Sequence, residues 1–321
     1  MKHFAIIGIG CGLVSALLFG VTGRVSFLSF VMFFLVPLPL FLAGLSMGAV
    51  TAAIGGVTGA VAAGAILGAR AGLSFVISVA VAPVVLSYLA LLSRSSDASQ
   101  DGAAQQVEWY PLGRLVLWCA VLSPALMAVS IVLSGMDAAA FREAIRQFSE
   151  LWLKAQPELR AQFEQAGGIE PLVDFLVRMV PSFATSVWML LIMGNLWLAA
   201  KVLDVSGRSM RPWPPFPDIE FPRMALAGLA ASLGATLLPG ALGLIGQGFA
   251  GSMITVFAVF GLAVLHHITR GYPARAFLLA TAYLAVFVFN WLAAVLLAGL
   301  GVAELGFGLR KRGSASGPAG T

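Results

Sequence analysis

Residues 8–20 read GIGCGLVSALLFG, and this stretch decides how its helix can pack. Gly8, Gly12, Ala16 and Gly20 are four positions apart, so they share one face of a helix. Helices in a lipid bilayer associate by close van der Waals contact, and small residues let two backbones approach. The stretch therefore predicts a helix with a bare docking edge, used either by another helix of the same chain or by another subunit.

The composition of the whole chain places this helix in a membrane. Of the 321 residues, 60% are hydrophobic and 10% are charged, whereas soluble domains carry about 25% charged residues. A water-soluble protein of this size needs a polar surface that so few charges cannot supply. The basic residues are scattered over short loops, which indicates membrane topology and not nucleic-acid binding. The lipid bilayer is thus the first expected partner, and nucleic acid is excluded.

Apolar stretches recur along the chain at lengths that approach the roughly 20 residues of a bilayer span. They are residues 4–23, 26–47, 49–68, 71–92, 114–135, 180–202, 223–238, 241–267 and 276–300. Two neighbouring pairs are barely separated, so either pair could be one crossing plus a re-entrant piece. The expected fold is all-α, a polytopic transmembrane helical bundle with eight or nine spans.

The order of apolar and hydrophilic segments predicts four parts of the chain. They are a first transmembrane helical block at 1–135, a hydrophilic amphipathic helical insert at 136–179, a second transmembrane helical block at 180–308 and a disordered tail at 309–321.

The insert has the pattern of two amphipathic helices. Apolar residues with helical spacing lead the first of them: Phe141, Ile145, Phe148 and Trp152. Pro157 can open the second helix, and Gly167-Gly168 can end it. We expect these helices to lie on the outer membrane surface, either as a connector resting on the headgroups or as a lid over a binding site.

The distribution of charge favours a cytoplasmic N-terminus. Residues 137–178 carry five basic and seven acidic residues, so this stretch is net −2 while the rest of the chain is net +7. Basic residues gather in cytoplasmic loops, which places the insert outside. Arg24 and Arg70 oppose this orientation, because they would fall in outside loops. The basic tail at 310–312 would also be outside after nine crossings, so the tail favours eight.

The sequence lacks the common motifs of catalytic and nucleotide sites. It has no G-x-x-x-x-G-K-[ST], no H-E-x-x-H and no G-x-S-x-G. Cys11 and Cys119 alone cannot build a disulfide framework or a metal cluster. We therefore expect no enzyme activity, no cofactor and no metal.

Polar residues inside the apolar spans are candidates for ligand binding because their burial in lipid is costly. Asn195, Gln247 and Asn290 lie within spans, and each could equally hydrogen-bond a neighbouring helix. His266 precedes His267 at the end of a span. It is a candidate for binding a ligand or a proton, and a polar helix end is the ordinary alternative.

Pro37 and Pro39 interrupt the second apolar stretch, FLVPLPLFLAGLSMG at 34–48. A broken helix frees backbone groups, and membrane proteins tolerate such groups where they line a cavity. This region is the strongest pointer in the sequence to a binding site.

Two further features concern charge and proline. Asp174 and Arg178 are four apart, which predicts an ion pair on one helix face.

The loop RPWPPFP at 211–217 predicts an extended path, with Trp213 and Phe216 at the membrane interface.

Several motifs together carry a family resemblance. They are PLPLFLAGLSMG at 37–48, YPLGRL at 110–115, NLWLA at 195–199, RPWP at 211–214, LPG at 238–240, GLAVLHHITRG at 261–271 and FGLRKR at 307–312. In this order they resemble the YybS-like bacterial membrane proteins, domain-of-unknown-function family 2232, from about residue 4 to 312. The resemblance implies a multi-pass protein of the bacterial inner (plasma) membrane.

The family is distantly similar to the substrate-binding S components of energy-coupling-factor transporters. This similarity implies an S-component-like core that binds an unknown small molecule near 37–48. It also implies docking on a T-like membrane subunit with ATPases through Gly8, Gly12, Ala16 and Gly20. The expected function is a small-molecule-binding transport component, with Pro37, Pro39, Asn195, Gln247, His266 and Asn290 as ligand-binding candidates.

Two other functions stay open. A non-transporting membrane scaffold or assembly factor would use the same small-residue edge and the basic inner loops. An intramembrane enzyme or proton-linked carrier would use His266 or His267. In the transport hypothesis, Gly12→Leu removes partner binding and leaves folding intact.

Overall fold

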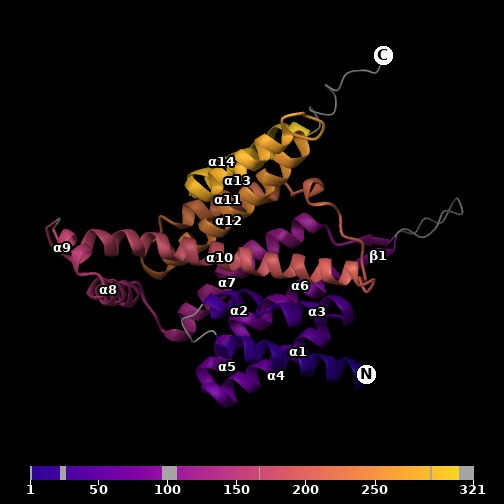
Figure 1. Ribbon diagram of the computed structural model, residues 1–321, viewed down its shortest axis with the longest axis horizontal. Helices are drawn as coiled ribbons and strands as arrows, with labels where there is room; N and C mark the ends of the chain where they lie inside the picture. The colour runs from indigo at the N-terminus through magenta and orange to yellow at the C-terminus, as the bar shows by residue number, and fades with distance from the viewer. Residues whose placement is uncertain (1, 22–26, 96–106, 166, 290, 311–321) are drawn as a thin grey trace, which may run out of the picture. The chain divides into compact units, whose positions relative to one another are not determined.

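Six helices in the computed structural model are long and apolar enough to cross a membrane (Figure 1). The structure describes residues 2–21, 27–95, 107–165, 167–289 and 291–310, and the count is for these residues. The six are Lys2–Val21 (α1), Ala49–Leu67 (α4), Ala69–Ala90 (α5, η1 and α6), Leu112–Ser134 (α7), Glu170–Val205 (α10) and Gly240–Ile268 (α12). The all-α membrane class is confirmed, and the count of eight or nine spans stays a prediction.

The remaining elements are shorter. The span Ala69–Ala90 consists of Ala69–Phe75 (α5), a π-helical turn at Val76–Ala80 (η1) and Val81–Ala90 (α6). The others are Phe27–Leu35 (α2), Leu38–Met47 (α3), Ala138–Lys154 (α8), Pro157–Gln165 (α9), Phe216–Asp218 (η2), Met224–Ala235 (α11), Arg275–Phe289 (α13) and Trp291–Phe307 (α14). Ser93–Ser95 (β1) pairs antiparallel with Val107–Trp109 (β2). The apolar stretch 26–47 is thus divided between two helices.

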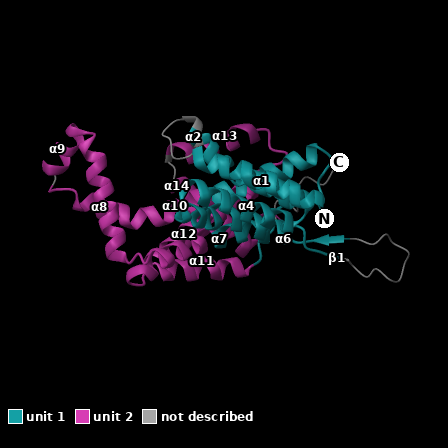
Figure 2. Cartoon of the chain, turned by 90° about the horizontal axis from the view of Figure 1, so that it is seen from below, with its two compact units in different colours: residues 1–122, 189–222 teal, residues 123–188, 223–321 magenta. Residues whose placement is uncertain are grey.

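The chain forms two compact units, drawn in teal and magenta in Figure 2. Unit 1 contains residues 1–122 and 189–222, and unit 2 contains residues 123–188 and 223–321. Two of the three limits between the units therefore fall inside α7 and α10. The four sequential parts expected above are defined by hydropathy and not by compactness, so they stay a prediction.

Unit 1 is built around the contact of α1 with α4. A Cβ atom on Gly8 would lie 2.7 Å from the carbonyl oxygen of Thr51, and one on Gly12 would overlap the carbonyl oxygen of Gly55. In the other direction, a Cβ atom on Gly55 would lie 2.8 Å from the carbonyl oxygen of Gly8. The two backbones approach to a distance that side chains would prevent.

Unit 2 contains a similar contact between α12 and α14. A Cβ atom on Gly301 would lie 2.5 Å from the carbonyl oxygen of Phe257, and one on Gly261 would overlap the carbonyl oxygen of Leu297. Both units therefore use facing small residues where two helices cross closely.

The hydrophilic insert contains the two expected helices, α8 and α9. Asp137 caps α8, because its Oδ1 accepts a hydrogen bond from the backbone N–H of Ala140 at 2.7 Å. Gly167 and Gly168 follow α9 with φ angles of +99° and +98°, in the left-handed region that glycine adopts without strain. The helical pattern of the insert is confirmed, and its place on the outer membrane surface stays a prediction.

Candidate functional site

At the helix break around Pro37, side chains of unit 1 donate hydrogen bonds to the free backbone carbonyl groups. Pro37 cannot donate a backbone hydrogen bond, so α2 ends at Leu35 and α3 begins at Leu38. Ser15 Oγ on α1 donates to the carbonyl oxygen of Val36. This hydrogen bond links the break to α1.

Asn195 on α10 also serves this break. Its Nδ2 donates to the carbonyl oxygens of Phe34 at 2.6 Å and Leu191 at 2.8 Å. The residue is 4% exposed, and its Oδ1 accepts no hydrogen bond within the described ranges. Asn195 therefore links α10 to α2, as the helix-packing alternative expected. A ligand role for Pro37, Pro39 and Asn195 stays a prediction.

The other predicted ligand residues belong to unit 2. The backbone carbonyl of Gln247 accepts a hydrogen bond from Ser182 Oγ at 2.8 Å, and His266 Nε2 lies 3.0 Å from the hydroxyl of Tyr283. Gln247 and His266 are 19 residues apart on α12, which is about 28 Å along a helix. They therefore do not share a site. Asn290 lies outside the described residues.

The small-residue edge of α1 is occupied by the chain itself over most of its length. Gly8 and Gly12 contact α4, and Ala16 is buried in a core cluster with Leu40 and Phe75. A Cβ atom on Gly20 would meet nothing within 4 Å. Packing within the chain therefore accounts for Gly8, Gly12 and Ala16, and docking of this edge on a partner stays a prediction.

A pocket of about 630 Å³ lies in unit 1, and none of its lining residues was predicted to bind a ligand. Its wall comes from the start of α7, the second half of α10 and the proline-rich loop after α10. The lining residues are Leu112, Val116, Met193, Gly194, Leu196, Trp197, Ala200, Lys201, Asp204, Trp213, Pro214, Pro215, Phe216 and Ile219. The volume is within the range of small-molecule sites.

The lining of the pocket is apolar except for two side chains. Lys201 and Asp204 are the ionisable residues of the lining. Lys201 Nζ lies 3.4 Å from Asp204 Oδ2, and the two side chains are 57% and 58% exposed. Such an exposed pair contributes little to stability. Both charges are therefore accessible to a bound molecule.

Arg211 holds the loop that forms one wall of the pocket. Its Nη1 donates to the carbonyl oxygens of Ala90 at 2.9 Å and Tyr110 at 3.1 Å. Its guanidinium carbon lies 4.7 Å from the ring centroid of Trp213, which lines the pocket. Ala90 is the last residue of α6, where carbonyl groups lack helical partners. Burial lowers the pKa of Arg211 from its usual value.

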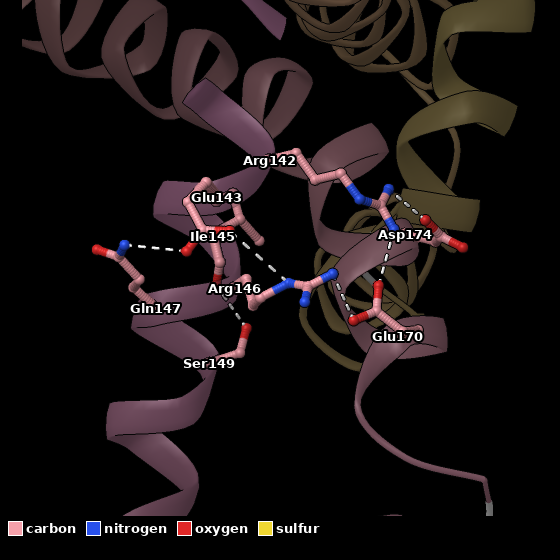
Figure 3. A network of polar contacts seen from close by, with 8 residues as sticks. All are labelled: Arg142, Glu143, Ile145, Arg146, Gln147, Ser149, Glu170 and Asp174. Atoms are coloured by element: carbon pink, nitrogen blue, oxygen red, sulfur yellow. Dashed lines mark hydrogen bonds and ion pairs between the residues drawn. The ribbon is translucent and has the colours of Figure 1, made fainter. Parts of the chain in front are cut away.

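A second polar cluster joins α8 to the start of α10 (Figure 3). Arg142 contacts Asp174 at 2.5 Å and Glu170 at 3.0 Å, and Arg146 contacts Glu170 at 2.7 Å. The hydrogen bonds from Arg142 to Asp174 and Glu170 raise the pKa of the Arg142 guanidinium. Among the described residues, Asp174 pairs with Arg142 and not with Arg178. The expected i,i+4 pair was wrong because α8 brings a closer cation.

Arg142→Gln is expected to loosen α8 and leave the rest of unit 2 folded. The variant removes the contacts of Arg142 with Glu170 and Asp174, while all four charged side chains of the cluster are at least a third exposed. Hydrogen exchange should rise in α8 and stay unchanged in α12. The matched control is Arg160→Gln, which removes a pair within α9 only. Equal exchange in α8 for both variants would contradict a linking role of Arg142.

Within the described ranges, no group of three or more His, Cys, Asp or Glu side chains converges as a metal site would require. The expectations of no metal, no cofactor and no catalysis are untested by this finding and stay predictions.

Comparison with known proteins supplies one match. The family described as "Predicted membrane protein (DUF2232)" matches residues 13–305. No curated protein and no solved structure matches the chain. The comparisons thus support a multi-pass helical membrane protein in contact with lipid. The likeness to S components and docking on a T-like subunit stay predictions.

Proposed function

The chain belongs to the DUF2232 family of predicted membrane proteins, and from that premise we propose that it binds an apolar or amphiphilic small molecule in the pocket of unit 1. The observation that carries this proposal is the lining itself. Twelve of its fourteen residues are apolar or glycine, and Trp197, Trp213 and Phe216 contribute aromatic surface. Apolar walls with a few placed polar groups are typical of small-molecule sites.

The pocket is accessible from its surroundings. Trp197 is 65% exposed although it lines the pocket. Part of the lining is therefore open to the surroundings of the protein. We infer binding and not catalysis, because Lys201 and Asp204 are the ionisable groups of the lining and they pair with each other.

Gly194→Leu is expected to prevent a small molecule from binding in the pocket. Gly194 lines the pocket, and a Cβ atom there would meet nothing within 4 Å. The leucine side chain can therefore fill the space without moving the backbone. Purified protein is incubated with a polar lipid extract of the source membrane, and bound molecules are counted by native mass spectrometry. Wild-type protein should retain a bound molecule, and Gly194→Leu should lose it.

The matched control for this test is Gly299→Leu. Gly299 lies in α14 of unit 2, and a Cβ atom there also meets nothing within 4 Å. The change in helix propensity is the same at both positions. Retention of the molecule by all three proteins, or its absence from wild-type protein, would show that the pocket is not a binding site. Binding should also raise the unfolding temperature of wild-type protein, because a ligand of the folded state stabilises it.

A further inference from the structure

The charge pattern of α10 predicts at which depth of the membrane the pocket lies. Between Arg178 and Lys201 the helix has 22 residues without a charge, which is about 33 Å of helix. The hydrocarbon core of a bilayer is about 30 Å thick. Lys201 therefore marks the point where α10 leaves the hydrocarbon core and enters the headgroup layer.

The start of α7 independently indicates the same membrane depth for the pocket. Leu112 and Val116 line the pocket, and they flank Arg114. After Arg114, α7 carries no Asp, Glu, Lys or Arg up to its end at Ser134. Both helices thus change from charged to uncharged sequence beside the same pocket. We therefore expect the pocket to extend across the boundary between headgroups and hydrocarbon.

The lining is ordered along this boundary. Met193, Trp197 and Lys201 are four apart on one face of α10, and all three line the pocket. From Met193 to Lys201 the helix advances about 12 Å. On α10, Met193 and Trp197 lie on the hydrocarbon side of Lys201, and Asp204 lies beyond it on the headgroup side. A molecule that fits this arrangement has an apolar body and a polar head.

The two charges specify the head. Lys201 attracts an anion and Asp204 attracts a cation, and their mutual pair at 3.4 Å is exposed and weak. A head with one charge would gain at one residue and be repelled at the other. A head with a phosphate and an ammonium group gains at both. Trp213 and Phe216 add the amphipathic and apolar aromatic surface that is common at membrane interfaces.

On the basis of the proposed function, we infer that the pocket of unit 1 binds a membrane lipid with a zwitterionic headgroup. The phosphate lies at Lys201, the ammonium lies at Asp204, and the acyl part extends along Trp197 and Met193 into the bilayer. The lipid is a bound ligand and undergoes no reaction.

The test compares lipids with identical acyl chains and different heads. Delipidated protein is loaded with phosphatidylethanolamine, phosphatidylglycerol or diacylglycerol, and retained lipid is measured by native mass spectrometry. Phosphatidylethanolamine should be retained about fivefold more than either other lipid, which corresponds to two weak exposed ion pairs. Asp204→Asn should abolish the preference over phosphatidylglycerol, whereas Lys201→Gln should weaken the preference over diacylglycerol and keep the discrimination against phosphatidylglycerol. Arg208→Gln, an exposed charge that is not part of the lining, should leave both preferences unchanged.

The outcomes separate the two proposals. If all three lipids are retained equally and Gly194→Leu releases all of them, the pocket binds apolar chains and the headgroup inference is overturned. If phosphatidylglycerol is preferred, Asp204 does not select the head, and the inference is again overturned. If Gly194→Leu changes the retention of no lipid, the proposed function itself fails.

Discussion

Gly12→Leu is expected to destabilise unit 1 by about 3 kcal/mol or more, at the upper end of overpacking effects. Any side chain at Gly12 overlaps the carbonyl oxygen of Gly55 in α4. This obstacle is backbone and cannot rotate away, so α1 and α4 must separate. A thermal unfolding curve in mild detergent should show a clearly lower midpoint than wild-type protein.

Gly10→Leu is the matched control for this prediction. Gly10 lies two residues away on the same helix, and a Cβ atom there meets nothing within 4 Å. The variant should unfold at the wild-type temperature or slightly above it, because leucine has the higher helix propensity. If Gly12→Leu does not accumulate, Gly12→Ala tests the same overlap with a single methyl group. Equal stability of Gly12→Ala and Gly10→Ala would show that α1 does not pack on α4 as described.

The overlap at Gly12 means that Gly12→Leu is not a clean test of partner docking. From the sequence, Gly12→Leu should remove a partner and leave folding intact. In the structure the same substitution disturbs the contact between α1 and α4, so loss of a partner in this variant would not identify a docking face. Gly20 is the position of the edge that stays open. Gly20→Leu is therefore the variant that tests docking without disturbing α4.

Local sequence patterns predicted local structure well. The helices of the hydrophilic insert follow from apolar spacing, and the break at Pro37 follows from the missing N–H donor of proline. Both depend on residues that are neighbours in the chain. The ion pair of Asp174 could not be predicted in this way, because its partner Arg142 precedes it by 32 residues on another helix.

The pocket was missed for the same reason. Its lining comes from three segments near residues 112–116, 193–204 and 213–219, and no one of them has the pattern of a site. A signal was nevertheless present in the sequence. The uncharged stretch of α10 ends at Lys201, and a loop with Trp213 and Phe216 follows within a few residues. Polar residues inside spans drew attention to Asn195, whereas its neighbours Gly194 and Leu196 line the pocket.

Arg211→Lys is expected to destabilise unit 1 by about 2–3 kcal/mol, the range for buried groups that lose a hydrogen bond to a charged partner. The guanidinium of Arg211 reaches the carbonyl oxygens of Ala90 and Tyr110 at once. An ammonium group is a single point on a flexible stem and does not reproduce this geometry. At least one buried carbonyl oxygen should then lose its partner. The unfolding midpoint in mild detergent measures the effect.

Loss of Arg211 should also displace the pocket wall, because the guanidinium packs on the lining residue Trp213. We expect Arg211→Lys to reduce lipid retention in native mass spectrometry, whereas Arg208→Lys should change neither retention nor stability. Arg208 is an exposed arginine three residues earlier in the same loop, where such substitutions stay within about 0.5 kcal/mol. If both variants behave like wild-type protein, the loop does not depend on Arg211. If Arg211→Lys lowers stability and leaves retention intact, Arg211 stabilises α6 and not the wall of the pocket.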